Sequence, residues 1–178
     1  MRRYLIKPLH FPVSCGKVMQ TINKRQEEAD LSVRWKRLLG LAVTGLWVWF
    51  IFARSARTAE ESSAESAMIL ELLRKLIPFL TDTVLRKLAH FTEYFILGGL
   101  LYMDWRIWNR GSVLAVLSLA AGIACVDELI IQANTAGRSG ELWDILLDTA
   151  GAAAAVGILL LLRRRKERRA HGDGRKEI

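Results

Sequence analysis

Cysteine is scarce in this sequence, and its scarcity excludes two classes of small protein. Only Cys15 and Cys125 occur among the 178 residues, and two isolated thiols cannot form the repeated metal-ligand pattern of a zinc module. A small disulfide scaffold needs a much higher cysteine content. Cys125 lies inside an apolar run, where a thiol packs as a small apolar side chain. We therefore expect neither a disulfide framework nor a metal site built from cysteines.

The chain is also too short for the many-helix body of a typical secondary transporter. It is 52% hydrophobic and 25% charged, with a mean hydropathy of +0.19. So high a hydropathy beside so many charges requires the two kinds of residue to be segregated along the chain, which excludes disordered and collagen-like proteins. A transmembrane helix needs about 20 residues. The sequence therefore predicts one all-α integral membrane domain, a four-helix bundle with tails and loops.

The net charge of +8 is concentrated at the two ends of the chain. Residues 1–37 form a basic leader, and residues 163–178 form a basic tail. Basic clusters beside apolar runs could bind nucleic acid, but the positive-inside rule and the attraction of anionic cytoplasmic lipid explain them with fewer assumptions. We expect both termini in the cytoplasm, the lipid bilayer as a partner, and no nucleic-acid partner.

Residues 38–162 hold four apolar runs that we interpret as membrane spans. The run 38–53 is free of charge and directly follows basic residues, as a retained signal anchor does. The other runs cover residues 85–103, 112–132 and 142–162. An even number of spans returns the chain to its starting side, which agrees with basic residues at both ends.

An amphipathic helix is expected in the outer segment between the first two spans. Apolar residues recur at helical spacing from Met68 to Ile77 with charged residues opposite, and Ser62 with Glu65 suggests a capping box at the start. Such a helix lies on a membrane interface. It could cover the site described next, or only connect two spans.

The acidic residues of the spans all lie near the outer ends that this topology predicts. An ionised carboxylate inside a membrane helix costs about 2.5–3.5 kcal/mol, so several of them need partners, protons, water or a ligand. One arginine and one titratable histidine cannot neutralise five carboxylates, which leaves room for a divalent cation as a cofactor. We therefore expect one polar outer-leaflet pocket. Its members are His90, Glu93, Tyr94, Asp127, Glu128, Gln132, Arg138, Asp144 and Asp148.

Several of these residues also carry a family resemblance. The string from Arg86 to Tyr94 is followed by Asp127-Glu128 with Gln132, then by Gly137-Arg138-Ser139-Gly140, and then by Asp144 and Asp148-Thr149-Ala150-Gly151. In this order and with these separations, residues 38–162 resemble the VanZ-like family. The resemblance implies a small multi-pass protein of the bacterial cytoplasmic membrane with a role in the cell envelope and in resistance to the glycopeptide antibiotic teicoplanin. The chain departs from the common pattern at Asp148, where asparagine is frequent, and at residues 134–136.

Three interpretations of the polar pocket stay open at this point. The first, slightly favoured, is a binding site for an anionic envelope precursor or a glycopeptide, with Arg138, Tyr94 and Gln132 as the ligand-binding residues. The second is a membrane-embedded hydrolase or phosphoryl-transfer enzyme acting on a lipid-linked substrate. The third is a buried ion-pair network that only fixes the helices in register. For the enzyme, the catalytic candidates are His90, Glu93, Asp127 and Glu128, and the candidate metal ligands are Glu128, Asp144 and Asp148.

Overall fold

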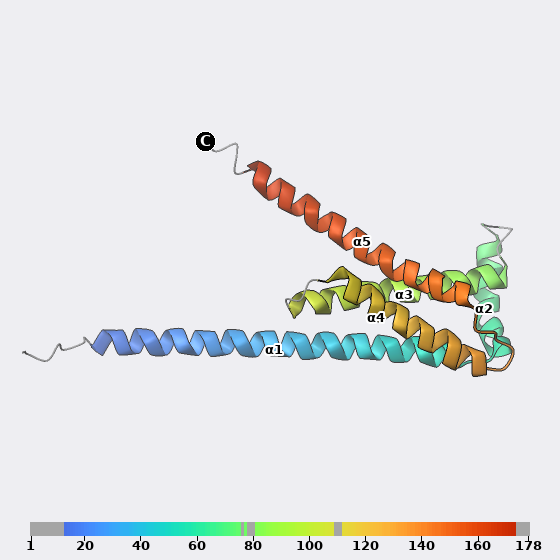
Figure 1. The fold of residues 1–178 in the computed structure, drawn as a ribbon, viewed down its shortest axis with the longest axis horizontal. Helices are drawn as coiled ribbons and strands as arrows, with labels where there is room; N and C mark the ends of the chain where they lie inside the picture. The colour runs from blue at the N-terminus through green and yellow to red at the C-terminus, as the bar shows by residue number, and fades with distance from the viewer. Residues whose placement is uncertain (1–12, 76, 78–80, 109–111, 174–178) are drawn as a thin grey trace, which may run out of the picture.

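A computed structural model describes residues 13–75, 77, 81–108 and 112–173, and these residues fold into helices joined by short turns, with no strand among them. Figure 1 shows α3 and α4 alongside α1, α5 diverging from them toward its C-terminal end, and the short helix α2 across one end. The predicted all-α fold is confirmed. The elements are α1 (Val13–Ser55), α2 (Ala59–Arg74), α3 (Asp82–Ile107), α4 (Val113–Val126), the π-helical turn η1 (Asp127–Ile131), the 3₁₀ turn η2 (Gln132–Asn134) and α5 (Leu142–Asp173).

Three of the helical segments are long and apolar enough to cross a membrane: residues 23–55, 113–134 and 142–169. The chain is thus a multi-pass membrane protein. Helix α3, on which the expected span 85–103 falls, is not among the three because polar residues interrupt its apolar sequence. Its 26 residues measure about 39 Å, which exceeds the roughly 30 Å hydrocarbon core. The count of four spans stays a prediction.

Helix α3 is the centre of the packing, and small residues bring α5 close to it. A β-carbon added to Gly98 would lie 2.6 Å from the Cα of Ala152, and one added to Gly151 would lie 2.5 Å from the backbone oxygen of Phe91. Glycine at these positions lets the two helix backbones approach more closely than larger side chains allow. The buried apolar residues of the core are Ile51, Tyr94, Leu97, Leu101, Tyr102, Val116, Ala120, Ala124, Ala152 and Val156.

Helix α2 starts earlier than the sequence suggested. The hydroxyl of Thr58 accepts a hydrogen bond from the backbone N–H of Glu61, and the Glu61 carboxylate accepts one from the backbone N–H of Thr58. This reciprocal pair is the capping box, so the predicted box at Ser62 and Glu65 is wrong. Ser62 lies inside the first turn, and Glu65 instead pairs with Arg57.

The expected amphipathic surface of α2 stays a prediction. Much of the predicted apolar face, including the side chains of Met68, Ile69 and Leu73 and all of Leu76, lies outside the described residues.

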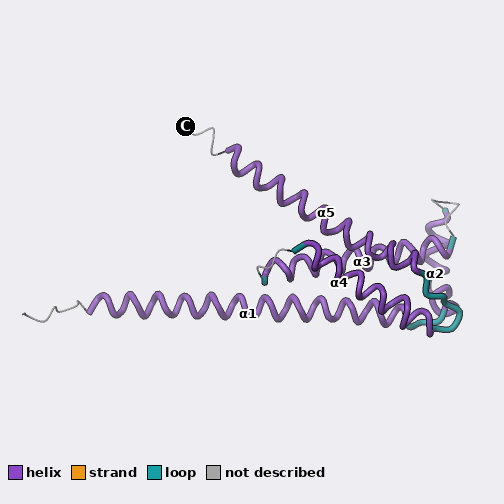
Figure 2. Tube along the Cα trace, in the orientation of Figure 1, coloured by secondary structure: helices purple, strands orange, loops and turns teal. Residues whose placement is uncertain are grey.

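The polar ends of the helices meet at one end of the molecule. Here the end of α1, the turns η1 and η2, loop 135–141 and the starts of α3 and α5 lie together, whereas α1 begins and α5 ends at the opposite end (Figures 1 and 2). The backbone N–H of Ala59 donates to the backbone oxygen of Ala136 over 3.1 Å, which joins the start of α2 to the loop. Gly137 in this loop has a φ of 73°, a left-handed conformation that favours glycine.

Candidate functional site

Four side chains from three elements converge beneath this end of the molecule, and we call them the acidic cluster. His90 comes from α3, Asp127 and Glu128 from η1, and Asp148 from α5. Each offers one ligand atom, and these atoms all lie within 4.8 Å of one another. The exposed fractions of Asp127, Glu128 and Asp148 are 0%, 1% and 0%. The sequence placed all four residues in one pocket, and the structure brings them together.

Two successive buried acids, Asp127 and Glu128, lie at the start of a π-helical turn. In a regular α-helix, neighbouring side chains diverge by about 100° around the axis. In η1 the backbone N–H of Gln132 reaches the backbone oxygen of Asp127, five residues back. This wider turn interrupts the α-helical register, as π-helical turns often do at functional sites. Asp127 and Glu128 are the first two residues of this turn, and both are buried in the same cluster.

Each acid of η1 is held by hydrogen bonds from other segments. The hydroxyl of Ser55, at the end of α1, donates to Asp127 Oδ2 over 2.9 Å. Glu128 accepts one hydrogen bond from the Gln132 amide and another of 3.3 Å from the backbone N–H of Glu141. These donors fix the orientation of both carboxylates.

Asp148 has no such donors. Its side chain is completely buried, and neither carboxylate oxygen has a hydrogen-bond partner among the described residues. His90 Nδ1 is in a similar position, since it lies 3.9 Å from both Glu93 Oε2 and Asp127 Oδ2, too far for a hydrogen bond. A buried polar atom without a partner is costly, and here several such atoms face one another.

Glu93 lies beside the cluster but has its own cation. Arg54 Nε lies 3.0 Å from Glu93 Oε1, and the indole N–H of Trp47 donates to the Glu93 backbone oxygen over 2.9 Å. Both partners belong to α1. This ion pair removes Glu93 from the charge excess of the cluster.

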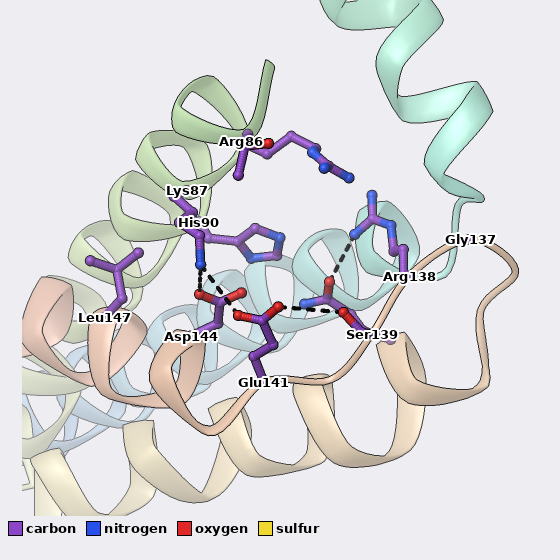
Figure 3. Close-up of a pocket in the computed structure, with 11 residues that line it drawn as sticks. Arg86, Lys87, His90, Gly137, Arg138, Ser139, Glu141, Asp144 and Leu147 are labelled. Carbon is purple, nitrogen blue, oxygen red and sulfur yellow. Dashed lines mark hydrogen bonds and ion pairs between the residues drawn. The ribbon is translucent and has the colours of Figure 1, made fainter. Parts of the chain in front are cut away.

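A cavity of about 120 Å³ lies above the acidic cluster. His90 and Gln132 line it and also contact the acids below, so they form its floor. Figure 3 shows the guanidinium groups of Arg86 and Arg138 facing the same space from α3 and from loop 135–141. A water needs about 10–15 Å³ of such volume. The cavity therefore has room for a small polar group, and a second cavity of about 110 Å³ adjoins it at the same three side chains, Arg86, His90 and Arg138.

The other charges at the cavity wall are paired. Lys87 makes a hydrogen-bonded ion pair with Asp144 and lies 3.8 Å from Glu141 (Figure 3). Asp144 is therefore at the cavity wall and outside the group of ligand atoms that includes Glu128 and Asp148. The sequence predicted three metal ligands. Glu128 and Asp148 lie in the acidic cluster, whereas Asp144 is ion-paired with Lys87.

Arg138 is a cation at this site whose hydrogen-bond donors are only partly used. Its Nη1 donates to the Gln132 side-chain oxygen over 3.1 Å, its Nε is buried without a hydrogen-bond partner, and no described carboxylate lies within ion-pair distance of it. Burial lowers the pKa of Arg138, with Arg86 nearby as the next cause. A guanidinium nevertheless stays protonated in proteins. The group is thus a partly desolvated cation whose remaining donors adjoin an open cavity.

The sequence did not single out Arg54, Ser55, Arg86, Lys87 or Glu141, which the structure places at this site. Arg54 and Ser55 come from the end of α1, which is remote in sequence, and nothing local to them indicated a role. Arg86 and Lys87 precede His90 by four and three positions, which is the spacing of one helical face. This spacing could have indicated from the sequence that Arg86 and Lys87 lie beside His90.

The comparisons with known proteins give one match. The family model described as VanZ/LLP1 matches residues 41–163, more than half of the chain. No curated protein and no solved structure matches the chain.

Proposed function

The chain belongs to the VanZ/LLP1 family, and we propose that it binds the anionic headgroup of a lipid-linked envelope precursor in the cavity between Arg86 and Arg138. The observation that carries this proposal is the state of Arg138. It is a half-buried guanidinium with no described carboxylate in ion-pair distance, and it adjoins an open cavity. Arginine offers parallel donors that match a phosphate or a carboxylate.

The surroundings of Arg138 favour an anion over a neutral ligand. Arg86 is the second cation of the cavity, and its nearest acid, Asp82, lies 3.5 Å away across one helical turn. Lys87 is engaged by Asp144 and Glu141. An anion between the two guanidiniums would offset their mutual repulsion and supply the acceptors that Arg138 lacks.

The surface around the cavity supports a ligand that arrives through the membrane. Large apolar side chains at the same end of the bundle are exposed, with exposed fractions of 52% for Leu88, 60% for Ile130 and 76% for Trp143. Exposed apolar residues on a membrane helix face lipid. A lipid-linked ligand can keep its chain in the bilayer while its headgroup enters the cavity from the outer leaflet.

This binding gives a route to the resistance role implied by the family. A protein that binds an anionic envelope precursor changes the amount of that precursor that is accessible at the outer membrane surface. Expression of the chain should then raise tolerance to teicoplanin-type glycopeptides, and the gain should disappear with Arg138→Ala.

A membrane-embedded hydrolase or phosphoryl-transfer enzyme is the second candidate, and the position of His90 favours it. His90 lines the cavity and also lies among the buried acids. An imidazole between an anion site and carboxylates can act as a general base or acid on the bound group. Conversion of a lipid-linked phosphate by the wild type, abolished in His90→Ala, would establish this function.

The test measures binding of a polyprenyl phosphate to the full chain in lipid nanodiscs. We expect Arg138→Ala to weaken binding by about tenfold or more, which corresponds to about 1.4 kcal/mol or more. The matched control is Arg163→Ala, because Arg163 is exposed, pairs with Glu167 and lies toward the other end of α5, away from the cavity. Equal affinity of the wild type and Arg138→Ala would refute the proposal. Inorganic phosphate, added as a competitor, separates headgroup binding from insertion of the lipid tail.

A further inference from the structure

We propose that the acidic cluster of His90, Asp127, Glu128 and Asp148 holds one divalent transition-metal ion beneath the floor of the cavity. The site differs from the proposed headgroup site, because its acids are buried and none of the three lines the cavity. The inference also does not depend on whether a headgroup binds above it.

The geometry of the four side chains fits a single ion. Carboxylate and imidazole ligands lie about 2.0–2.2 Å from a metal such as zinc, so two ligands of one ion are at most about 4.4 Å apart. The ligand atoms of the cluster all lie within 4.8 Å of one another. Movements of a few tenths of an ångström would therefore complete a coordination shell.

Unpaired oxygen atoms point to a ligand that the protein does not itself supply. Asp148 is completely buried, and both of its carboxylate oxygens lack a hydrogen-bond partner among the described residues. One of its oxygens lies within 4.8 Å of a ring nitrogen of His90, and His90 Nδ1 is also buried without a hydrogen-bond partner among the described residues. A metal ion accepts electron pairs from such atoms and removes the cost of leaving them unpaired.

The charge of the acidic cluster also favours a bound cation. Three carboxylates meet there, and no described lysine or arginine lies within ion-pair distance of any of them. A divalent cation offsets two negative charges within one small volume. Arg138, the nearest loop cation, donates to Gln132 and leaves the acids without a direct partner.

The surrounding hydrogen bonds resemble the outer shell of a metal site. Ligand carboxylates in such sites are themselves held by further hydrogen bonds. Ser55 orients Asp127, and Gln132 with the backbone of Glu141 orients Glu128. Each oxygen that accepts one of these bonds keeps a second lone pair for a metal.

The donor set selects the class of ion. Magnesium and calcium prefer all-oxygen sites, and sulfur-ligated ions are excluded because the cluster contains no cysteine. One imidazole with three carboxylates suits divalent ions that accept both nitrogen and oxygen ligands, such as Mn²⁺ and Zn²⁺.

The experiment uses the full chain, stripped with a chelator and titrated with Mn²⁺ alone, without lipid phosphate or inorganic phosphate. We expect about one bound Mn²⁺ per chain by electron paramagnetic resonance, with coupling to one imidazole nitrogen that His90→Ala abolishes. Asp148→Ala should weaken binding beyond the about 10–100-fold that outer-shell substitutions cost. Asp144→Asn is the matched control, since this aspartate lies one turn earlier on α5 and pairs with Lys87. It should bind Mn²⁺ like the wild type.

Two results would overturn the proposal. The first is a wild-type chain that binds neither Mn²⁺ nor Zn²⁺ at micromolar concentration, and the second is equal binding by the wild type and Asp148→Ala. Should Asp148→Ala lose its helical circular dichroism, Asp148→Asn keeps the side-chain shape and is expected to weaken binding by about tenfold. Arg138→Ala should retain the metal, so failure of headgroup binding and failure of metal binding are separate outcomes.

Discussion

Ser55, the last residue of α1, donates a hydrogen bond of 2.9 Å to the carboxylate of Asp127, and the two residues are 72 positions apart. Both side chains have an exposed fraction of 0%. This bond joins the end of α1 directly to the acidic cluster. The position of α1 and the orientation of Asp127 therefore depend on each other.

Replacing Ser55 with alanine should destabilise the protein, because Asp127 would lose its donor while it stays buried. We expect a loss of about 1–3 kcal/mol, measured as a lower melting temperature of the detergent-solubilised chain. Ser118→Ala, at an exposed position of α4, is the control and should melt like the wild type. Equal melting temperatures for Ser55→Ala and the wild type would show that the bond contributes nothing.

Gly98 and Gly99 are adjacent in sequence and should respond in opposite ways to alanine. A β-carbon at Gly98 would collide with the backbone of Ala152, whereas at Gly99 nothing lies within 4 Å. Gly98→Ala should push α3 from α5 and cost about 1–3 kcal/mol. Gly99→Ala should be neutral, or slightly stabilising because alanine favours the helix. Thermal unfolding of the two variants checks the difference, and equal effects would contradict the packing of α3 on α5.

Removing Arg54 should leave Glu93 as an unpaired buried acid. The side chain of Glu93 is 11% exposed and that of Arg54 is 36% exposed, so solvent screens part of the interaction. We expect Arg54→Ala to cost about 1–3 kcal/mol, below the range for a fully buried pair. The double variant Arg54→Ala/Glu93→Gln should recover stability, because a neutral amide tolerates burial better than a lone carboxylate. A double variant less stable than Arg54→Ala would show that Glu93 does not depend on this cation.

The membrane topology is open to a direct measurement. Four spans with basic ends place both termini in the cytoplasm, and we expect reporter fusions at either end to give cytoplasmic signals. A cysteine introduced at Ser139 should react with a membrane-impermeant thiol reagent from outside intact cells. Reaction only after the cells are broken would place loop 135–141, and with it the cavity, on the cytoplasmic side.

The regular parts of the site could be predicted because helical spacing and topology determine them. Glu128 and Gln132 are four positions apart, and the structure shows the hydrogen bond that this spacing allows. The meeting of His90, Asp127 and Asp148 followed from the predicted alternation of the helices, which places the polar ends of three of them at the same end of the molecule.

Other features could not be predicted because they arise from contacts between remote segments or from irregular backbone. The partners of Glu93 and Asp127 come from α1, which is separated from Glu93 by α2 and part of α3, and from Asp127 by α2, α3 and α4. Asp144 and Asp148 carry the same side chain, and the sequence does not distinguish them. In the structure Asp144 is ion-paired with Lys87, whereas Asp148 is buried without a hydrogen-bond partner among the described residues. The sequence did not indicate the π-helical turn.

That turn makes the register of one membrane helix a determinant of the site. Where the backbone bond runs from Gln132 to Asp127, the chain contains one residue more than a regular α-helix would use for the same advance. Deleting a single residue within 129–131 would restore ordinary helical spacing and leave the helical segments on either side in their present orientation. It would remove the wide turn in which Asp127 and Glu128 lie, with no charged residue replaced. The number of residues in this segment is therefore a determinant of the site in addition to the identity of its side chains.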